Sequence, residues 1–408
     1  MNPKSLYIHF KKILLKWIFH FQDIIGNRYS SLINSEKYLV ASVLSTFLPN
    51  NGIVPIRDST YKSDENRFQR HIVNRIPEKD DFFSQSTTVL IITPRRLGNY
   101  PNAIFEGFQN FLREQRIQFQ WHCLNEMGTN YLEVVSGLFS DISKHSRLVL
   151  VLDPLAPTEI YSRYRNMDAD WINIQKKKFS FSVAVFLGDI WRAKDRQCVI
   201  SWVEPVDTFF HVDPVASHTY PEDIRNKMFF YPFVSFPVLS KSLAGKNDKK
   251  HQVLFSGQVR DSDRRWWLRQ FSSLTKNCNV QLITHSWYKF SSDKVLSQSK
   301  YLEVLAESSA CFGLSQRGAN HWILPARSFE TLRMGTVLIQ QEGPNCSPGQ
   351  YFLKPYEDYI PFISLSELRY ITNDYLKDYG TLQKIAKNGQ ESLSRHYPPQ
   401  LFIRRLLS

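Results

Sequence analysis

The chain alternates short apolar, β-rich runs with helical or loop segments, and it does so in two series. The first series predicts strands at Thr88–Thr93, Ile117–Cys123, Leu148–Asp153, Ser182–Leu187, Val199–Val203 and Met228–Val234. Between the first two runs, the segment Pro101–Gln115 places four apolar residues on one helical stripe: Phe105, Phe108, Phe111 and Leu112. Strands that alternate with helices in this way form parallel sheets covered on both faces.

A polar, charged, Gly-containing linker, Ser240–Lys250, precedes the second series. Its predicted strands are Val253–Ser256, Val280–Thr284, Ala310–Leu314, Thr336–Ile339 and Tyr359–Ile363, and its predicted helices are Arg264–Leu274, Lys300–Glu307, Pro325–Met334 and Ser366–Tyr379. A chain of 408 residues exceeds what one core usually serves. We therefore predict a helical extension over residues 1–85, one α/β domain over 86–240, a second over 251–395 and a C-terminal helix over 396–408.

The segment from Ser315 to Gln340 carries the most chemical information. A polar loop with Arg317 and Gly318 follows the apolar run Ala310–Leu314. Pro325 then opens a helix, Gly335 ends it, and a β-type run follows. The segment therefore predicts a strand, a loop, a short helix and a second strand.

Arg327 and Glu330 lie three residues apart near the start of this predicted helix, so they share one face. A cation and a carboxylate beside free backbone N–H groups suit a ligand with phosphates at one end and hydroxyls at the other. Nucleotide-sugars have that composition. A surface Arg–Glu pair on an ordinary βαβ unit is the alternative interpretation.

This segment resembles the nucleotide-sugar signature of GT-B glycosyltransferases, in particular the family-4-like and exostosin-like branches. Their pattern is a Gly-containing loop, then Arg, two residues, Glu, four residues and Gly, then an apolar strand, and Arg327, Glu330 and Gly335 fit it in order. Trp322 stands where many family-4 members have a second Glu. The resemblance implies an α/β fold of two Rossmann-like domains facing across a cleft. It also implies that the Glu holds the ribose hydroxyls while Arg or Lys residues hold the diphosphate.

A second element, Val253–Arg265, resembles the first strand and turn of the GT-B nucleotide domain. There a Gly and a following Arg or Lys line the diphosphate, which implies roles for Gly257 and Arg260. Arg264 and Arg265 are equally well explained as the solvated start of a helix. The complete predicted nucleotide-sugar set is Gly257, Arg260, Arg317, Gly318, His321, Arg327, Ser328 and Glu330.

The base that activates the acceptor hydroxyl is expected from the first domain. Three carboxylates follow predicted strands: Asp153, Asp189 and Glu204. Asp189 is the preferred candidate, because it follows Gly188 directly after a strand and resembles an acidic position of this superfamily, although a carboxylate there can equally cap a helix. Arg327 and Arg260 would complete the catalytic set by neutralising the departing diphosphate.

Two Asp-x-Asp triplets, Asp168–Asp170 and Asp261–Asp263, are compatible with a divalent metal of the GT-A type. No apolar strand precedes Asp168, and Asp261 precedes a basic helix, where Asp residues serve as helix-start groups, so we interpret both triplets as structural. GT-B enzymes generally need no metal, so we predict no metal site and no cofactor beyond the nucleotide-sugar itself. Neither Gly-x-x-x-x-Gly-Lys nor Gly-x-Gly-x-x-Gly occurs, which argues against P-loop kinases and dehydrogenases.

The net charge of +13 predicts anionic partners, but no nucleic-acid-binding motif accompanies it, so we predict no nucleic-acid partner. Five widely spaced cysteines indicate a reducing, cytoplasmic location. Leu6–Ile25 is apolar but interrupted by lysines, which suits an interfacial helix on an anionic membrane or a helix packed on the protein's own body.

These observations predict a metal-independent glycosyltransferase that moves a sugar from a nucleotide-diphosphate donor to a hydroxyl of a glycan, glycolipid or polysaccharide. Two alternatives stay open. One is a catalytically inactive GT-B module that acts as a binding or assembly partner, and the other is a metal-dependent GT-A transferase.

Overall fold

A computed structural model describes residues 86–407, with gaps at 94–99, 153–165, 188–195, 197–198, 214–219, 233–248, 259–261, 276–277, 279, 286–297, 317–321 and 344–346. The predicted helical extension over residues 1–85, with its segment Leu6–Ile25, and most of the predicted linker lie outside the described residues. Among the described helices, none has the length and apolar character that a membrane crossing requires.

The first lobe is built on a six-stranded sheet of order β2-β1-β3-β4-β5-β6, and every neighbouring pair is parallel. Its strands are β1 (Thr87–Thr93), β2 (Gln118–Cys123), β3 (Arg147–Leu152), β4 (Ser182–Leu187), β5 (Thr208–His211) and β6 (Met228–Phe230). Short 3-10 turns, η2 (Leu124–Glu126) and η3 (Gly128–Asn130), follow β2.

Both faces of the strands β1, β3 and β4 are buried, because their alternate residues enter opposite cores, whereas Gln118 and Gln120 of the edge strand β2 are exposed. In β1, Val89 and Ile91 belong to one core, and Leu90 and Ile92 belong to the other. Helix α5 (Tyr100–Glu114) covers the first face, and α6 (Tyr131–Ser143), α7 (Ala169–Phe179) and α10 (Glu222–Lys227) cover the second. Continuous apolar strands of this kind are the pattern of a parallel sheet covered on both sides.

The predicted strand Val199–Val203 was wrong. Residues 199–201 are helical, residues 202–205 form a turn, and the strand is β5, which begins at Thr208. Val199 and Val206 are buried and Trp202 packs against the same core, so the spacing is that of a helix face. A short apolar run cannot be assigned to helix or strand by periodicity alone.

The second lobe has a five-stranded parallel sheet of order β11-β10-β9-β7-β8. Its strands are β7 (His251–Gln258), β8 (Val280–His285), β9 (Ser308–Gly313), β10 (Val337–Gln341) and β11 (Ile360–Phe362). The helices are α11 (Ser262–Leu274), α12 (Gln298–Ala306), α13 (Ala326–Arg333), α14 (Leu365–Asn373) and α15 (Tyr379–His396), with 3-10 turns η7 (Pro348–Tyr351) and η8 (Tyr375–Lys377). Two separate parallel sheets with alternating helices confirm the predicted α/β fold class.

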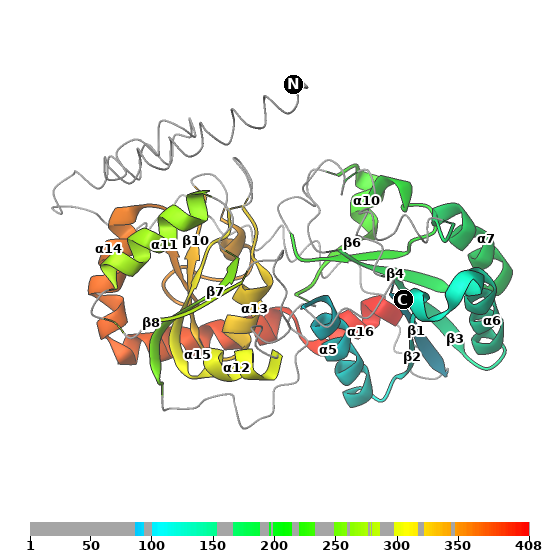
Figure 1. Cartoon of the computed structure of the whole chain (residues 1–408), viewed down its shortest axis with the longest axis horizontal. Helices are drawn as coiled ribbons and strands as arrows, with labels where there is room; N and C mark the ends of the chain where they lie inside the picture. Colours follow the sequence, from blue (N-terminus) through cyan, green and yellow to red (C-terminus); the bar gives the residue numbers. More distant parts are fainter. Residues whose placement is uncertain are drawn as a thin grey trace, which may run out of the picture.

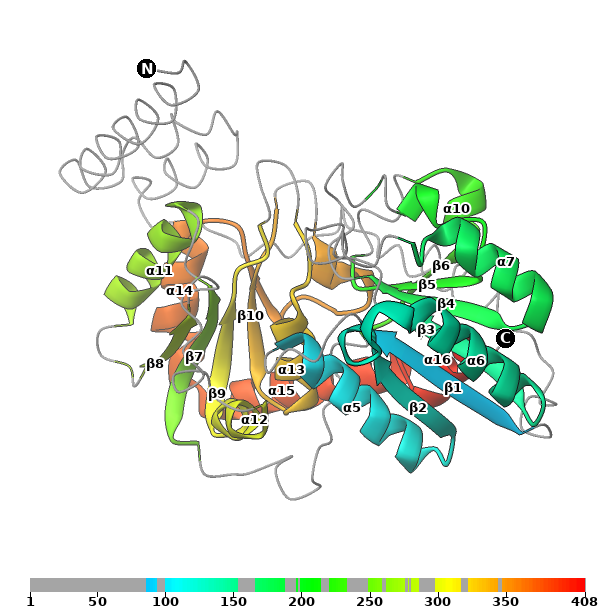
Figure 2. The ribbon, with the colours of Figure 1, turned by 45° about the vertical axis from the view of Figure 1, so that its right-hand side comes forward.

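The last helix, α16 (Pro399–Leu407), leaves the second lobe and packs beneath the sheet of the first (Figures 1 and 2). Phe402 is fully buried there, with ring centroids 4.4 Å from Phe210 and 5.8 Å from Phe108. Tyr397, just before α16, lies 5.4 Å from Phe230 and packs edge-on against it. One buried apolar cluster therefore runs through both lobes.

Candidate functional site

The second sheet has its topological switch point between β7 and β9. The chain passes from β7 to β8 on one side and then crosses to β9 on the other. In open α/β sheets, ligands bind outside the carboxyl ends of the strands at such a point. The end of β7 carries Gly257, and the segment after β9 leads into α13.

The structure brings Gly257 and Arg327 into contact, although they lie 70 positions apart in the chain. The Nη1 group of Arg327 donates a hydrogen bond to the backbone carbonyl of Ser256. Its guanidinium carbon also lies 5.6 Å from the centre of the Phe255 ring. A cation of helix α13 is therefore held at the carboxyl end of β7.

Gly257 is required by this contact for two reasons. Its φ of 140° is a conformation that residues with side chains rarely adopt. A Cβ atom on this residue would also fall onto the Arg327 guanidinium.

We expect Gly257→Ala to weaken nucleotide binding at least tenfold, because the new methyl group must displace the guanidinium. Backbone strain should also lower the free energy of unfolding by about 1–3 kcal/mol. Calorimetric titration with nucleoside diphosphates, together with urea denaturation, measures both effects. Gly137→Ala is the matched control, since a Cβ there meets open space within an exposed part of α6. Unchanged nucleotide affinity in Gly257→Ala would mean that the position of the Arg327 guanidinium beside Gly257 does not matter for nucleotide binding.

Glu330 lies on the inner side of α13 and is only 2% exposed. Burial raises the pKa of the Tyr301 phenol well above its usual value, and the nearby Glu330 carboxylate raises it further. Burial is the main cause that raises the pKa of the Cys311 thiol to about 11, and the Glu330 carboxylate raises it further. The Tyr301 hydroxyl is 3.0 Å from the Ser256 hydroxyl. Glu330 is thus close to the end of β7, and its side chain is buried in the interior.

Helix α13 has the boundaries that its sequence indicates. Pro325 is its N-cap, no side chain caps its first turn, and Gly335 follows it with a φ of 62°. Pro325 therefore offers no side-chain acceptor to the first N–H groups of the helix. Ser328 is fully buried, and its hydroxyl donates to Gln340 Oε1 at 2.8 Å, so the structure gives it a bond within the protein.

The remaining predicted site residues lie outside the described residues. They are Asp189, Arg260, Arg317, Gly318 and His321. Their roles stay predictions. The loop that holds three of them is anchored at both sides, because Ser315 Oγ donates to the Gln341 carbonyl and Gln316 forms an antiparallel bridge with Trp322.

Trp322, which stands where many family-4 members have a Glu, is packed into the protein. It is 4% exposed, and a Cβ on Gly343 would come within 2.6 Å of its ring. The indole therefore closes the base of the loop against the end of β10 and offers no charge to a ligand.

Two of the alternative carboxylates have structural partners. Asp168 accepts a hydrogen bond from the Trp171 backbone N–H at 2.9 Å and caps α7, so it has a structural role, as predicted for this triplet. Glu204 is exposed and accepts a hydrogen bond from Asn173. Asp153 and Asp261 lie outside the described residues.

Sequence reasoning missed His211 and Asp213 at the carboxyl end of β5. They are 2% and 1% exposed, and His211 is in register with Leu187, two residues before Asp189. The run Phe-Phe-His-Val-Asp-Pro repeats the strand-then-Asp-Pro pattern of Val-Leu-Asp-Pro at Asp153. This pattern indicates a strand before Asp213, whereas the predicted strand is Val199–Val203.

Glu342, directly after β10, was also missed. It is 1% exposed, and its Oε1 accepts hydrogen bonds from the Tyr359 hydroxyl at 3.0 Å and the Gly349 N–H at 3.2 Å. Burial raises the pKa of its carboxyl group well above the usual value, while those two donors lower it less strongly. Burial therefore favours the protonated form of this carboxyl in the folded protein, compared with the unfolded chain.

This burial predicts a pH dependence of stability. Unfolding lets Glu342 ionise, so the unfolded state holds fewer protons, and stability falls as the pH rises above the ordinary carboxyl range. The slope approaches about 1.4 kcal/mol per pH unit for one group. Glu342→Gln should remove this part of the slope, measured by urea denaturation between about pH 5 and pH 8.

The other titratable groups around this carboxyl are Tyr356, Tyr359 and Glu367, and they are the same in both proteins. The difference between the two curves therefore isolates Glu342. Curves that run parallel across the range would show that Glu342 is already ionised in the folded state.

Comparison with protein-family models and with solved structures shows which proteins this chain resembles. Residues 260–408 match the family model described as glycosyl transferase-like. Solved structures of an alpha-glucosyltransferase share the fold. Its complex with UDP is 11% identical, with 76% of this chain and 96% of that chain covered and a TM-score of 0.50. Its complex with UDP-glucose and DNA containing an abasic site is 10% identical, with 76% and 95% covered and a TM-score of 0.50.

A third structure, of alpha-glucosyltransferase with UDP and a 13-mer DNA containing a HMU base, is 9% identical, with 76% and 95% covered and a TM-score of 0.51. The comparison with curated proteins finds no match for this chain. At these identities the structures establish the fold alone. The chain has the GT-B fold of two Rossmann-like domains, and the resemblance to GT-B glycosyltransferases predicted from the signature is confirmed.

Proposed function

We propose that this chain transfers a sugar from a nucleotide-diphosphate-sugar donor to a hydroxyl group of a glycan, glycolipid or polysaccharide, without a catalytic metal. One observation carries the proposal. The Arg327 guanidinium, the Ser256 carbonyl and Gly257 meet at the carboxyl edge where the second sheet has its switch point. Most of that lobe, from residue 260 onward, matches the glycosyl transferase-like model.

Arg327 is the residue that neutralises the departing diphosphate in this proposal. Its guanidinium has five N–H donors, so the bond to the Ser256 carbonyl leaves others for phosphate oxygens. Negative charge builds on the leaving group in the transition state, and a fixed cation lowers the barrier there. Gly257 lets this guanidinium lie close to the backbone at the end of β7.

The other roles follow the family resemblance. Arg260, Arg317 and His321 would contact the donor from the loops, Glu330 would orient the ribose, and Asp189 would accept the proton of the acceptor hydroxyl. For Glu330 this role requires a small rotation toward the ligand, because its side chain is 2% exposed. In the described part of the chain, no group of three or more His, Cys, Asp or Glu residues is arranged to hold a metal ion.

The donor nucleotide is proposed to be a uridine diphosphate, because the structures with the same fold were solved with UDP or UDP-glucose. Some of those structures also contain DNA. The prediction that this chain has no nucleic-acid partner therefore lacks support from the comparisons, and DNA belongs in the acceptor panel of any assay.

Thermal shift with a panel of nucleoside diphosphates and nucleotide-sugars tests the proposal. We expect UDP or another nucleoside diphosphate to raise the melting temperature of the wild type and to have no effect on Arg327→Ala. Arg395→Ala, an exposed arginine in the last turn of α15, is the matched control and should respond like the wild type. If no nucleotide shifts the wild type, the inactive binding module becomes the better interpretation.

A further inference from the structure

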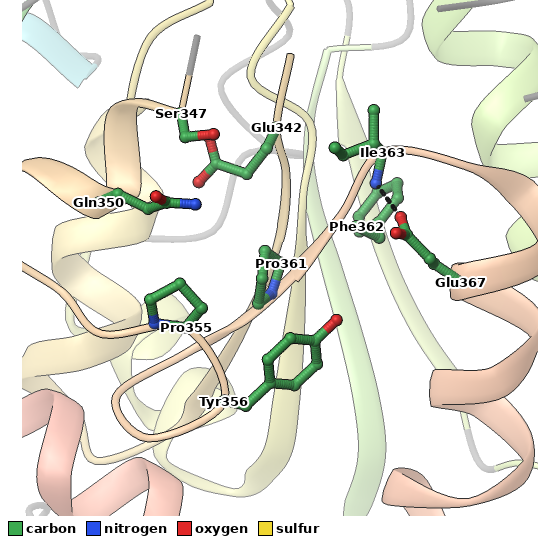
Figure 3. A pocket seen from close by; sticks show the side chains of 9 residues that line it. All are labelled: Glu342, Ser347, Gln350, Pro355, Tyr356, Pro361, Phe362, Ile363 and Glu367. Carbon is green, nitrogen blue, oxygen red and sulfur yellow. Dashed lines mark hydrogen bonds between the residues drawn. The ribbon is translucent and has the colours of Figure 1, made fainter. Parts of the chain in front are cut away.

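A small cavity lies at the carboxyl edge of the second sheet, beyond the ends of β10 and β11. It has a volume of about 20 Å³, and its polar lining comes from Glu342, Ser347, Gln350, Tyr356 and Glu367. Figure 3 shows the carboxyl group of Glu342 pointing toward the side chains of Ser347 and Gln350. A cavity of this size holds one water molecule or one polar group of a larger ligand.

The two oxygens of Glu342 differ. Oε1 accepts hydrogen bonds from Tyr359 and Gly349, which use both of its lone-pair directions. Oε2 is buried and has no hydrogen-bond partner among the described residues. An unsatisfied buried polar atom is costly, so a group from outside the chain is expected to complete it.

The surroundings fix the carboxyl in this orientation. A Cβ on Gly349 would come within 2.6 Å of Glu342 Oε1 and 2.7 Å of the Tyr359 ring. Only glycine therefore lets Gly349, Glu342 and Tyr359 pack this closely. Tyr359 itself is fully buried. The second carboxyl at the cavity, Glu367, is already satisfied by the N–H groups of Ile363 at 2.6 Å and Ser364 at 3.0 Å.

The chemistry of the lining selects the ligand group. Oε1 already accepts from two donors, so Oε2 is the oxygen left for a ligand group, and burial favours the protonated form of the acid, in which Oε2 is a donor. Two carboxyl groups disfavour an anion such as phosphate, and the size excludes a whole sugar ring or base. The complementary partner is a single uncharged oxygen, either a hydroxyl or a carbonyl.

The cavity is within reach of a ligand bound at Arg327. Strands β9 and β10 are neighbours, and the backbone of Gln341 is bonded to Ser315 at the start of the signature loop. From the crevice between β7 and β9 to the end of β10 is about 5–10 Å at normal strand spacing. A nucleotide-sugar is longer than this, so it can contact both places.

We propose that this cavity is a subsite of the nucleotide-sugar site and that Glu342 recognises an uncharged hydroxyl or carbonyl oxygen of the donor through Oε2. The inference rests on the proposed function, because it assumes a donor bound at Arg327. It adds a specificity-determining residue from β10 to the residues that the signature supplies.

Calorimetric titration of the full chain with UDP and with UDP-glucose tests the subsite. Glu342→Met keeps a side chain of similar length but has no donor, and we expect it to bind five- to tenfold more weakly, as loss of one neutral hydrogen bond predicts. Glu342→Gln keeps an N–H donor and should bind within about twofold of the wild type. Weaker binding of UDP-glucose alone assigns the oxygen to the sugar, whereas equal weakening of UDP assigns it to the nucleoside.

Tyr359→Phe is an independent test, because it frees the Glu342 carboxyl to rotate without altering the cavity lining. We expect about twofold to threefold weaker binding of the same ligand. Wild-type affinity in both Glu342→Met and Tyr359→Phe would mean that the cavity holds only a structural water and would overturn the proposal. An equal loss in the Gln and Met variants would also overturn it. If the wild type binds neither ligand, the proposed function fails instead.

Discussion

Arg327→Ala is expected to lower kcat/KM for sugar transfer by about 100- to 1000-fold, because in the proposed mechanism Arg327 is the cation that stabilises the charge on the leaving diphosphate. The guanidinium is fixed by the Ser256 carbonyl and the Phe255 ring, so it needs no reorganisation when the ligand binds. Release of UDP from the UDP-sugar, measured with and without acceptor, gives the rate.

Arg327→Lys separates charge from geometry. It keeps the positive charge but loses the planar arrangement of donors, so we expect an intermediate loss of about tenfold. Arg395→Ala should retain wild-type kinetics, because this residue lies exposed near the end of α15. A wild-type rate in Arg327→Ala, with the fold intact, would remove Arg327 from the mechanism and with it the central part of the proposal.

Phe402→Ala is expected to reduce the free energy of unfolding by about 3–5 kcal/mol, which is the usual effect of removing a fully buried aromatic ring. The Phe402 ring has no exposed surface and lies against Phe210 at 4.4 Å and Tyr231 at 4.9 Å. Helix α16 follows α15 of the second lobe in the chain but packs on the first lobe. Removing the Phe402 ring should therefore also weaken the packing between the two lobes.

Urea denaturation and limited proteolysis near residues 397–399 measure these two effects. Gln400→Ala, on the exposed side of the same helix, should change stability by less than about 0.5 kcal/mol. A loss in Phe402→Ala no larger than in this control would mean that α16 does not contribute to the core of the first lobe.

Much of the fold was readable from local pattern. Ser182–Leu187 was predicted with the boundaries that β4 has, and the apolar run at Ala310–Leu314 differs from β9 by two residues at its start and one at its end. Val199–Val203 failed because a helix face and a buried strand look alike over five residues, and the spacing of Val199, Trp202 and Val206 decides between them only once the core is known.

Some residues of the candidate site could likewise be predicted from the sequence, and others could not. The signature helix with Arg327 and Glu330 could be found from spacing, because both residues lie within one turn of α13. Glu342 could not be found from the sequence, because a Glu-Gly pair after an apolar run also describes an ordinary solvent-exposed loop. Its burial depends on Tyr359 and Gly349, which the turn η7 and strand β11 bring to it from later in the chain.

The sequence alone therefore determined the alternation of strands and helices, the division into two sheets and the short helix with its Arg and Glu, because each of these follows from residues close together in the chain. Only the tertiary structure decided that Arg327 rests on the carbonyl of Ser256, that α16 returns to the first lobe and that Glu342 is buried with one oxygen unsatisfied. These features join residues far apart in the chain, and their energies come from burial and contact, which local pattern does not encode.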